Sequence, residues 1–349
     1  MEVGTPRVTP WSLSALVFIV TVCVTPMCLD RTFIAETGPS LLTWLLLAIC
    51  TAGIGYYLQM RVTMPQNQAW LPMRILFALF YAVGAGMMLN AWLTVIALID
   101  LPVSPRMIVA ALSLMPAIYV LRLGIEAVAR LTTFIALIAL PTLVLLVIGA
   151  STAMHISELM PRPLGFTGVP GIWPVILFAP RGFVILNAFA QDCREQHVRY
   201  VLAGAAAAAL LLLVALIMPV LVYGRAPATM MTFPTLRAIG TISSSYLVVQ
   251  RIAFLSSVIW QMIITVVMAS YGIASIRAIG LPVRALIDWK ALAVLAGVIG
   301  AVAYPELPED QYAALIGVWS LLGLFLFIVR PLGILALRLL QLRPEWASP

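Results

Sequence analysis

Long apolar segments separated by short polar connections repeat along the whole chain. We count ten runs of about 17–25 mostly apolar residues, the length at which a helix spans the roughly 30 Å hydrocarbon core of a bilayer. Their predicted centres are Val20, Leu47, Met87, Leu114, Ala139, Arg181, Leu211, Ile264, Leu295 and Leu322. The fourth run carries Pro116 and the ninth is rich in Ala and Gly, so nine or eleven spans are the alternatives. The pattern predicts an all-α membrane protein with about ten transmembrane helices.

Two of these apolar segments are interrupted, at matching places of the two halves of the chain. Thr25-Pro26-Met27 falls inside the run from Leu16 to Leu29, and Pro180-Arg181-Gly182 falls inside the run from Ile172 to Ala190. Broken helices persist in a membrane only where protein or a wet cavity satisfies the freed backbone groups. Paired breaks in two repeats indicate a small-molecule site near the bilayer midplane. The plainer alternative is a pair of proline kinks.

Composition excludes the soluble classes of protein. Hydrophobic residues make up 63% of the 349 residues and charged residues 9%, and the mean hydropathy is +1.09, whereas an ordinary soluble domain is roughly a quarter charged. The net charge of +7 comes almost wholly from arginine, since Lys290 is the one lysine. Such charges set orientation in a membrane, so nucleic acid is not an expected partner. Arg7 before the first run resembles a signal peptide, but the run is long and no small-x-small cleavage site follows, so we expect a retained helix.

Basic residues between the spans predict the orientation. With the N-terminus inside, 13 of the 20 basic residues face the cytoplasm and 6 face outward, with Arg181 left in the membrane. The inner set is Arg7, Arg61, Arg74, Arg122, Arg130, Arg194, Arg199, Arg277, Arg284, Lys290, Arg330, Arg338 and Arg343. The outer set is Arg31, Arg106, Arg162, Arg225, Arg237 and Arg251. Both termini are therefore expected to be cytoplasmic.

We expect one integral membrane domain, residues 1–349, made of two five-helix halves at about 11–151 and 172–340. The longest connection, from Gly224 to Val248, lies outside in this topology and holds Phe233-Pro234-Thr235. Proline readily occupies the first turn of a helix. This connection is predicted either to carry a short interfacial helix or to be a surface loop with some helical content.

Polar and small residues within the spans are candidates to line the ligand site. Gly84 and Gly86, with Asn90 one turn on, either contact the ligand or let helices pack closely. Ser256, Ser257 and Gln261 in the eighth span line a cavity or bond neighbouring backbone. The full set of candidate ligand-binding residues is Thr25, Pro26, Met27, Gly84, Met88, Pro180, Arg181, Gly182, Phe183, Ser257 and Gln261.

Enzyme and metal chemistry find no support in the sequence. Cys23, Cys28, Cys50 and Cys193 lack metal-type spacing and are expected to pack as small apolar residues. His155 and His197 fall in loops on opposite sides of the membrane. We expect neither catalysis nor a cofactor.

Several motifs in order along the chain resemble the spore germination permease family, the B subunits of nutrient germinant receptors. They are Val8-Thr9-Pro10-Trp11, the stretch Arg122-Leu123-Gly124-Ile125-Glu126-Ala127-Val128-Ala129-Arg130, Phe233-Pro234-Thr235-Leu236, and Val249-Gln250-Arg251-Ile252. The resemblance covers essentially the full chain. It departs at Leu236-Arg237, where an acidic residue is expected, and at Arg181, where relatives tend to carry a small residue.

The resemblance implies a fold and a set of partners. It implies a relative of the amino acid–polyamine–organocation superfamily, with a LeuT-like 5+5 inverted repeat and broken first and sixth helices. It further implies a nutrient ligand, often an amino acid, and an A-type membrane subunit and a C-type lipoprotein as partners in the inner membrane of the spore. The function implied is to bind the nutrient and to signal exit from dormancy.

The alternative is a secondary transporter that moves an amino acid with a proton or sodium. Ion coupling usually leaves an ionisable group within a span, and the sequence places no Asp, Glu, Lys or His there. This favours a receptor, although carbonyls and hydroxyls alone can hold sodium. Arg181 either holds a ligand carboxylate with its planar fork or bonds carbonyls freed by the breaks.

Overall fold

The computed structural model describes residues 8–28, 54, 70–99, 105–151, 154–155, 184–189, 192–193, 198–231, 234–240, 247–281, 289–307 and 309–341. Apart from one isolated β-bridge between Val8 and Cys193, the elements formed by these residues are helical. They are α1 (Pro10–Cys28), α4 (Leu71–Ile99), α5 (Arg106–Leu123), α6 (Ile125–Ala150), α9 (Leu186–Phe189), α10 (Val198–Tyr223), α11 (Arg225–Met230), α12 (Pro234–Gly240), α13 (Leu247–Ile279), α14 (Trp289–Ala303), α15 (Glu309–Leu324), η7 (Phe325–Val329) and α16 (Arg330–Gln341).

The predicted spans agree with these helices. Every predicted centre except Leu47 and Arg181 lies inside one of them, and those two lie outside the described residues. Within the described part of the chain, five helices are long and apolar enough to cross a membrane, at 71–97, 106–123, 125–149, 257–279 and 314–336. The prediction of an all-α membrane protein is confirmed.

Local sequence explains where several helices begin and end. The Thr9 hydroxyl accepts a hydrogen bond from the Ser12 amide at 3.1 Å, which caps the start of α1, and Pro10 occupies the first helical position. Gly124, at φ 89°, separates α5 from α6. Only glycine adopts this conformation at little cost, so Gly124 allows the chain to turn between the two spans. Pro116 lies within α5 and does not end it.

Two expectations about local structure need correction. The backbone of α1 is helical to Cys28, so Thr25-Pro26-Met27 forms the last described turn of that helix and does not interrupt it. The connection after α10 holds two short helices, α11 and α12, where the expectation was one short helix or a surface loop with some helical content, and α12 begins at Pro234.

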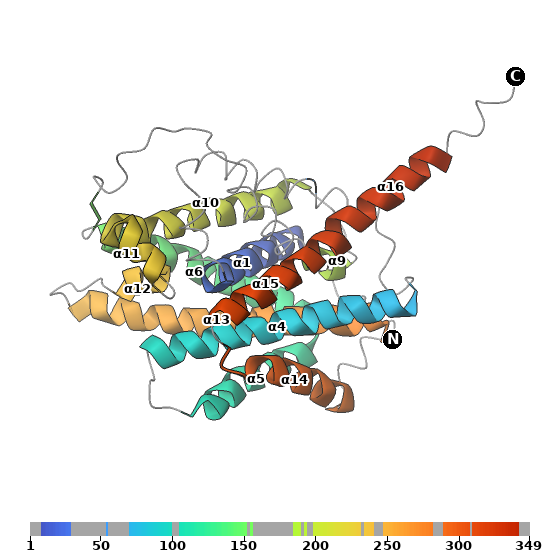
Figure 1. Ribbon diagram of the computed structural model, residues 1–349, viewed down its shortest axis with the longest axis horizontal. Helices are drawn as coiled ribbons and strands as arrows, with labels where there is room; N and C mark the ends of the chain where they lie inside the picture. The colour runs from blue at the N-terminus through green and yellow to red at the C-terminus, as the bar shows by residue number, and fades with distance from the viewer. Residues whose placement is uncertain are drawn as a thin grey trace, which may run out of the picture.

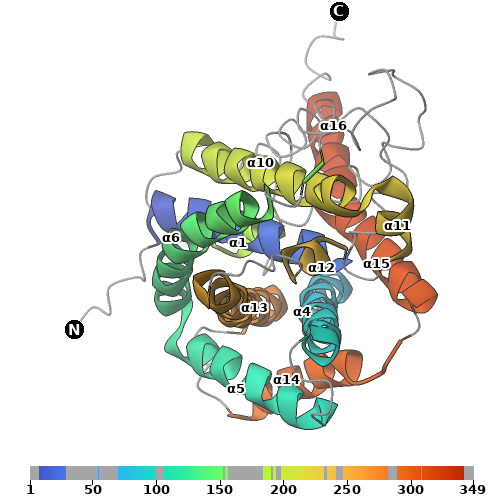
Figure 2. The ribbon, with the colours of Figure 1, turned by 90° about the vertical axis from the view of Figure 1, so that its left-hand side faces the viewer.

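Helix α13 lies at the centre of the molecule and packs against α4, α5 and α6 (Figures 1 and 2). Most of its membrane-length window is buried, at 83%, compared with 28% for α5 and 24% for α6. Helices α4 and α13, which are the third predicted spans of the two halves, run side by side along the molecule. On the other side of the core, α1 packs against α10 and α6.

Apolar side chains cover the outer surfaces of α5 and α6. They include Leu112, Met115, Tyr119, Leu137 and Ile148, each more than half exposed. An aqueous surface would not tolerate so continuous an apolar patch, whereas hydrocarbon favours it. The helices that surround α13 therefore present this surface to lipid.

Candidate functional site

The residues that follow the predicted break in the sixth segment are bound to α4. The phenol of Tyr81 donates a hydrogen bond to the carbonyl of Val184 at 2.9 Å, and both residues are fully buried. Val184 comes directly after Pro180-Arg181-Gly182-Phe183, so this bond fixes the backbone at the edge of the predicted break. In hydrocarbon such a carbonyl needs a partner, and Tyr81 supplies it.

An aromatic cluster surrounds Tyr81. Its members are Phe77, Phe80, Tyr271, Trp319 and Phe327. The rings of Phe80 and Trp319 stack at 4.9 Å, and the Trp319 indole donates to the Phe80 carbonyl at 2.9 Å. This cluster joins α4, α13 and the tenth span at the level of Val184.

Gly84 makes room for this aromatic packing. A Cβ at Gly84 would lie 2.6 Å from Trp319, closer than real contacts allow, and 3.2 Å from Tyr271, which is tighter than most real contacts. Met88, one turn further along α4, is fully buried. The two interpretations of Gly84 were ligand contact and close helix packing, and the described contacts support close packing.

Gln261 belongs to a second polar cluster. Its side-chain oxygen accepts hydrogen bonds from the Trp92 indole at 2.5 Å and the Ser113 hydroxyl at 3.1 Å, and its amide lies 3.4 Å from the Thr265 hydroxyl. The cluster thus ties α4, α5 and α13 together. Ser257 lies one turn before Gln261 and is half-buried.

The two clusters lie at different depths. Gly84 is next to Tyr271, whereas Gln261 precedes Tyr271 by ten residues on the same helix, a separation of about 15 Å along the axis. Gly84 and Gln261 therefore do not contact one small ligand together. Pro180, Arg181, Gly182 and Phe183 lie outside the described residues, as do the side chains of Thr25, Pro26, Met27 and Ser256.

Asn90 and Gly86 hold the end of α14. The Asn90 amide donates to the carbonyls of Ala303 at 3.0 Å and Pro305 at 2.8 Å, which the helix end leaves without intrahelical partners. A Cβ at Gly86 would lie 2.5 Å from Val302. These two residues pack and cap a helix.

A charged network lies at the C-terminal end of the sixth segment. Arg277 of α13 forms an ion pair with Asp192 and donates to the carbonyl of Ala188. The side chains of Arg277 and Asp192 are only 19% and 17% exposed. The Asp192 carbonyl accepts a hydrogen bond from the Val8 amide at 3.1 Å. One network thus joins the segment before α1, the residues after α9, and α13.

Sequence reasoning missed Tyr81, Trp92, Asp192 and Arg277. A signal existed for Tyr81, which precedes Gly84 by three residues and so shares its helix face. Arg277 was counted only as a loop charge and Asp192 was not singled out, because their pairing joins distant parts of the chain. Among the described residues, no group of three His, Cys, Asp or Glu side chains could hold a metal ion.

Comparisons with known proteins agree with this architecture. A sequence model of a family described as spore germination protein matches residues 68–304. Among solved structures, the chain is similar to Mhp1, a nucleobase-cation-symport-1 family transporter in a closed conformation with bromovinylhydantoin bound. The TM-score is 0.53 at 12% identity, and the match covers 94% of this chain and 80% of the other. This likeness shows a LeuT-type fold. A search of curated protein sequences finds no match.

Proposed function

We propose a function for this chain from one premise: it belongs to the family of spore germination proteins. It is a permease-like integral membrane protein. Within that class, we assign it the role of nutrient-binding subunit of a spore germinant receptor. It binds a small nutrient, an amino acid by the family resemblance, and signals exit from dormancy together with an A-type membrane subunit and a C-type lipoprotein. Its place is the inner membrane of the spore, with both termini in the cytoplasm.

The observation that carries the proposal is the hydrogen bond from Tyr81 to Val184. In this proposal the ligand contacts Pro180–Phe183. The backbone that follows is bound to α4 at Val184 and to α13 through Ala188 and Asp192. Binding at the predicted break is therefore expected to change the contacts of this backbone with α4 and α13, the two longest described helices. A ligand shifts an equilibrium only by its differential affinity for the two states, and this linkage supplies a source of that difference.

The ligand site is assigned to the last described turn of α1, the predicted break of the sixth segment and the face of α4 beside them. It comprises Thr25, Pro26, Met27, Gly84, Met88, Pro180, Arg181, Gly182 and Phe183. Gln261 and Ser257 precede Tyr271 by about 15 and 21 Å along α13 and are assigned to an access path rather than to the same site. In this assignment the Arg181 guanidinium holds the ligand carboxylate bidentately, a geometry that lysine does not reproduce.

The Arg181→Lys substitution tests the carboxylate assignment. The variant is expected to fold normally and to lose most of its affinity for the amino acid ligand, since the charge stays but the paired geometry goes. Ligand binding by the purified protein, measured by calorimetry across the standard amino acids, checks this. Affinity equal to that of the parent protein would leave Arg181 with only a structural role in bonding freed carbonyls.

A secondary transporter is the second candidate, favoured by the likeness to a symporter. Purified protein in vesicles separates the two. A receptor binds its ligand without accumulating it, whether or not a proton or sodium gradient is imposed. Uptake that collapses when the gradient is removed would establish transport. In parallel, spores that lack the chain are expected to stop responding to the nutrient that the purified protein binds.

A further inference from the structure

The segment that leads into α1 pairs with the residues that follow α9. The Val8 amide donates to the Asp192 carbonyl at 3.1 Å, and Val8 forms a parallel β-bridge with Cys193. The side chains of Val8 and Cys193 are only 3% and 6% exposed. A two-stranded pairing is at best marginally stable by itself, and this one is a single bridge. Other residues must therefore hold it closed.

Arg277 fixes the chain against which Val8 lies. Its guanidinium forms an ion pair with the Asp192 carboxylate and donates to the Ala188 carbonyl. These two contacts, four residues apart in the chain, fix the course of the backbone from α9 to Asp192. They also fix the carbonyl that accepts the Val8 amide, so Arg277 positions the acceptor of the bridge.

The end of α13 that carries Arg277 is bound to α4. Helix α13 ends before Gly280, which has a φ of 80°. A Cβ at Gly280 would overlap the guanidinium of Arg74, and the Arg74 Nε donates to the carbonyl of Ala278 at 3.4 Å. The Arg277 side chain therefore extends from a helix end that is fixed in place.

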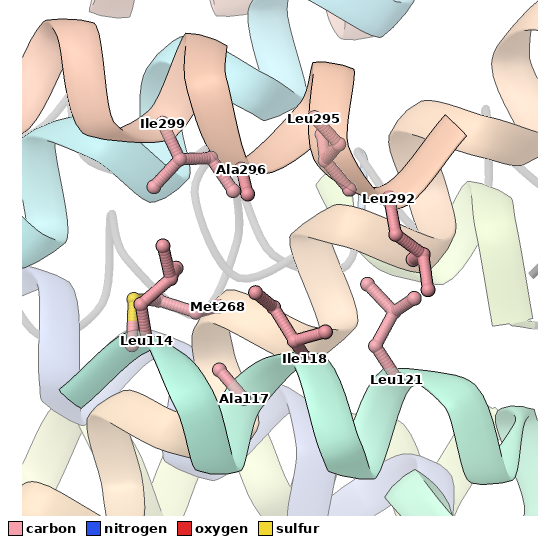
Figure 3. Close-up of a pocket in the computed structure, with 9 residues that line it drawn as sticks. All are labelled: Leu114, Ala117, Ile118, Leu121, Met268, Leu292, Leu295, Ala296 and Ile299. Carbon is pink, nitrogen blue, oxygen red and sulfur yellow. The ribbon is translucent and has the colours of Figure 1, made fainter. Parts of the chain in front are cut away.

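Close packing also fixes α13 against α5 and α14. Leu121 of α5 lies so near Gly272 of α13 that a Cβ there would overlap it. Around this contact, apolar side chains such as Leu121, Met268 and Leu295 meet from the three helices (Figure 3). The cavity that they leave is no larger than one water molecule. This interface leaves α13 little room to move.

The other side of the pairing is joined directly to α1. Thr9 follows Val8, and its hydroxyl accepts a hydrogen bond from the Ser12 amide at the start of α1. A displacement of Val8 is therefore passed to the first turn of α1. Between Val8 and α13, the ion pair of Arg277 and Asp192 is accessible to water, at 19% and 17% exposed. Charges that regain hydration can separate without the penalty of two unpaired ions in the core.

We propose that Val8, Asp192, Cys193 and Arg277 form a latch that closes the end of the bundle where α1 begins. When Arg277 separates from Asp192, the acceptor carbonyl is no longer fixed, the Val8 bridge opens, and the Cys193 thiol becomes accessible to water. Ligand binding at the predicted break opens this latch. The trigger rests on the proposed function, whereas the latch itself does not.

Alkylation of Cys193 tests the latch without any ligand. In the purified full chain with Cys23, Cys28 and Cys50 replaced by alanine, Cys193 is the one remaining thiol. Its rate of reaction with N-ethylmaleimide follows the population of the open form. Arg277→Gln is expected to raise this rate about tenfold, because a mostly buried pair is lost. Val8→Pro is expected to raise it as well with both charges intact, since proline has no amide hydrogen to donate.

Arg130→Gln is the matched control, because Arg130 forms an exposed ion pair within α6. It is expected to leave the alkylation rate unchanged. Rates equal to the parent's in both Arg277→Gln and Val8→Pro would overturn the latch. An equal rise in Arg130→Gln would also overturn it, since exposure of Cys193 would then follow a general loss of stability.

The trigger is tested on the same single-cysteine protein with a mixture of the twenty standard amino acids as the probe. The mixture is expected to raise the alkylation rate of the parent, and to have little further effect on Arg277→Gln, whose latch is already open. An unchanged rate in the parent, with the variants behaving as expected, would reject control of the latch by these nutrients and leave the latch established.

Discussion

Single side chains in this protein bind backbone carbonyls of segments that are distant in the chain. Tyr81 binds Val184, Asn90 binds the end of α14, and Arg277 binds Ala188. Each contact joins residues more than eighty positions apart in the chain. In hydrocarbon an unsatisfied carbonyl costs several kcal/mol, because no water is present to replace the lost partner. These polar side chains therefore determine which irregular backbone the core can hold.

The Tyr81→Phe variant removes one of these contacts without changing the shape of the ring. It leaves the buried Val184 carbonyl without this donor, so the expected loss of stability is about 1–3 kcal/mol. Thermal unfolding of purified protein measures it. Tyr119→Phe is the control, because Tyr119 is 64% exposed on the lipid side and should leave stability unchanged. Equal unfolding temperatures for Tyr81→Phe and the parent would show that this hydrogen bond does not hold the segment.

At the scale of elements, contacts with neighbouring helices hold both ends of the described part of the sixth segment. Tyr81 fixes Val184 at its start, and Arg277 fixes Ala188 within α9 and Asp192 beyond it. The Val8 amide adds the segment that leads into α1. Because these contacts come from α4, α13 and the N-terminal segment, a movement of α9 requires at least one of them to change.

A double-mutant cycle on Arg277→Gln and Asp192→Asn measures this connection. The pair is mostly buried, so we expect a coupling free energy of about 1–3 kcal/mol. Arg130 and Glu126 form the matched control, an exposed pair within α6 whose side chains are 79% and 43% exposed. Such pairs typically contribute under about 0.5 kcal/mol. Similar coupling in the two pairs would mean that burial adds nothing at Arg277.

At the scale of the whole molecule, the sequence predicts the spans better than their contacts. Bilayer thickness fixes the length of a span, so apolar runs locate helices such as α4 and α13 directly. Bilayer thickness does not specify which helices pack together. The hydrophobic pattern of α13 does not specify this either, because α13 is apolar on nearly every face. Gln261 could be selected as a polar residue in a span, but its partners Trp92 and Ser113 come from two other helices. The roles of Gly86 and Asn90 likewise depend on α14, more than two hundred residues later.

The orientation of the whole molecule is a prediction that single cysteines can test. Native Cys193 is a poor reporter, because it is 6% exposed beside Val8. In a variant without the four native cysteines, Arg199→Cys and Tyr304→Cys place thiols at exposed sites on opposite sides. An impermeant thiol reagent added to intact cells is expected to label Tyr304→Cys alone, and to label Arg199→Cys only after permeabilisation. The reverse pattern would invert the topology.

The tenth span has a mechanical consequence. Helices α15, η7 and α16 are continuous from Glu309 to Gln341, and α16 extends beyond the bundle (Figure 1). Trp319 packs on Phe80 of α4, and the Arg330 guanidinium lies 5.4 Å from the ring of Phe77, also on α4. The tenth span can therefore tilt about these contacts with α4. From Arg330 to Gln341 the free arm is about 16 Å long, and a tilt of about 10° moves its tip by about 3 Å. A small tilt of the tenth span about its contacts with α4 therefore produces its largest displacement at the end of α16.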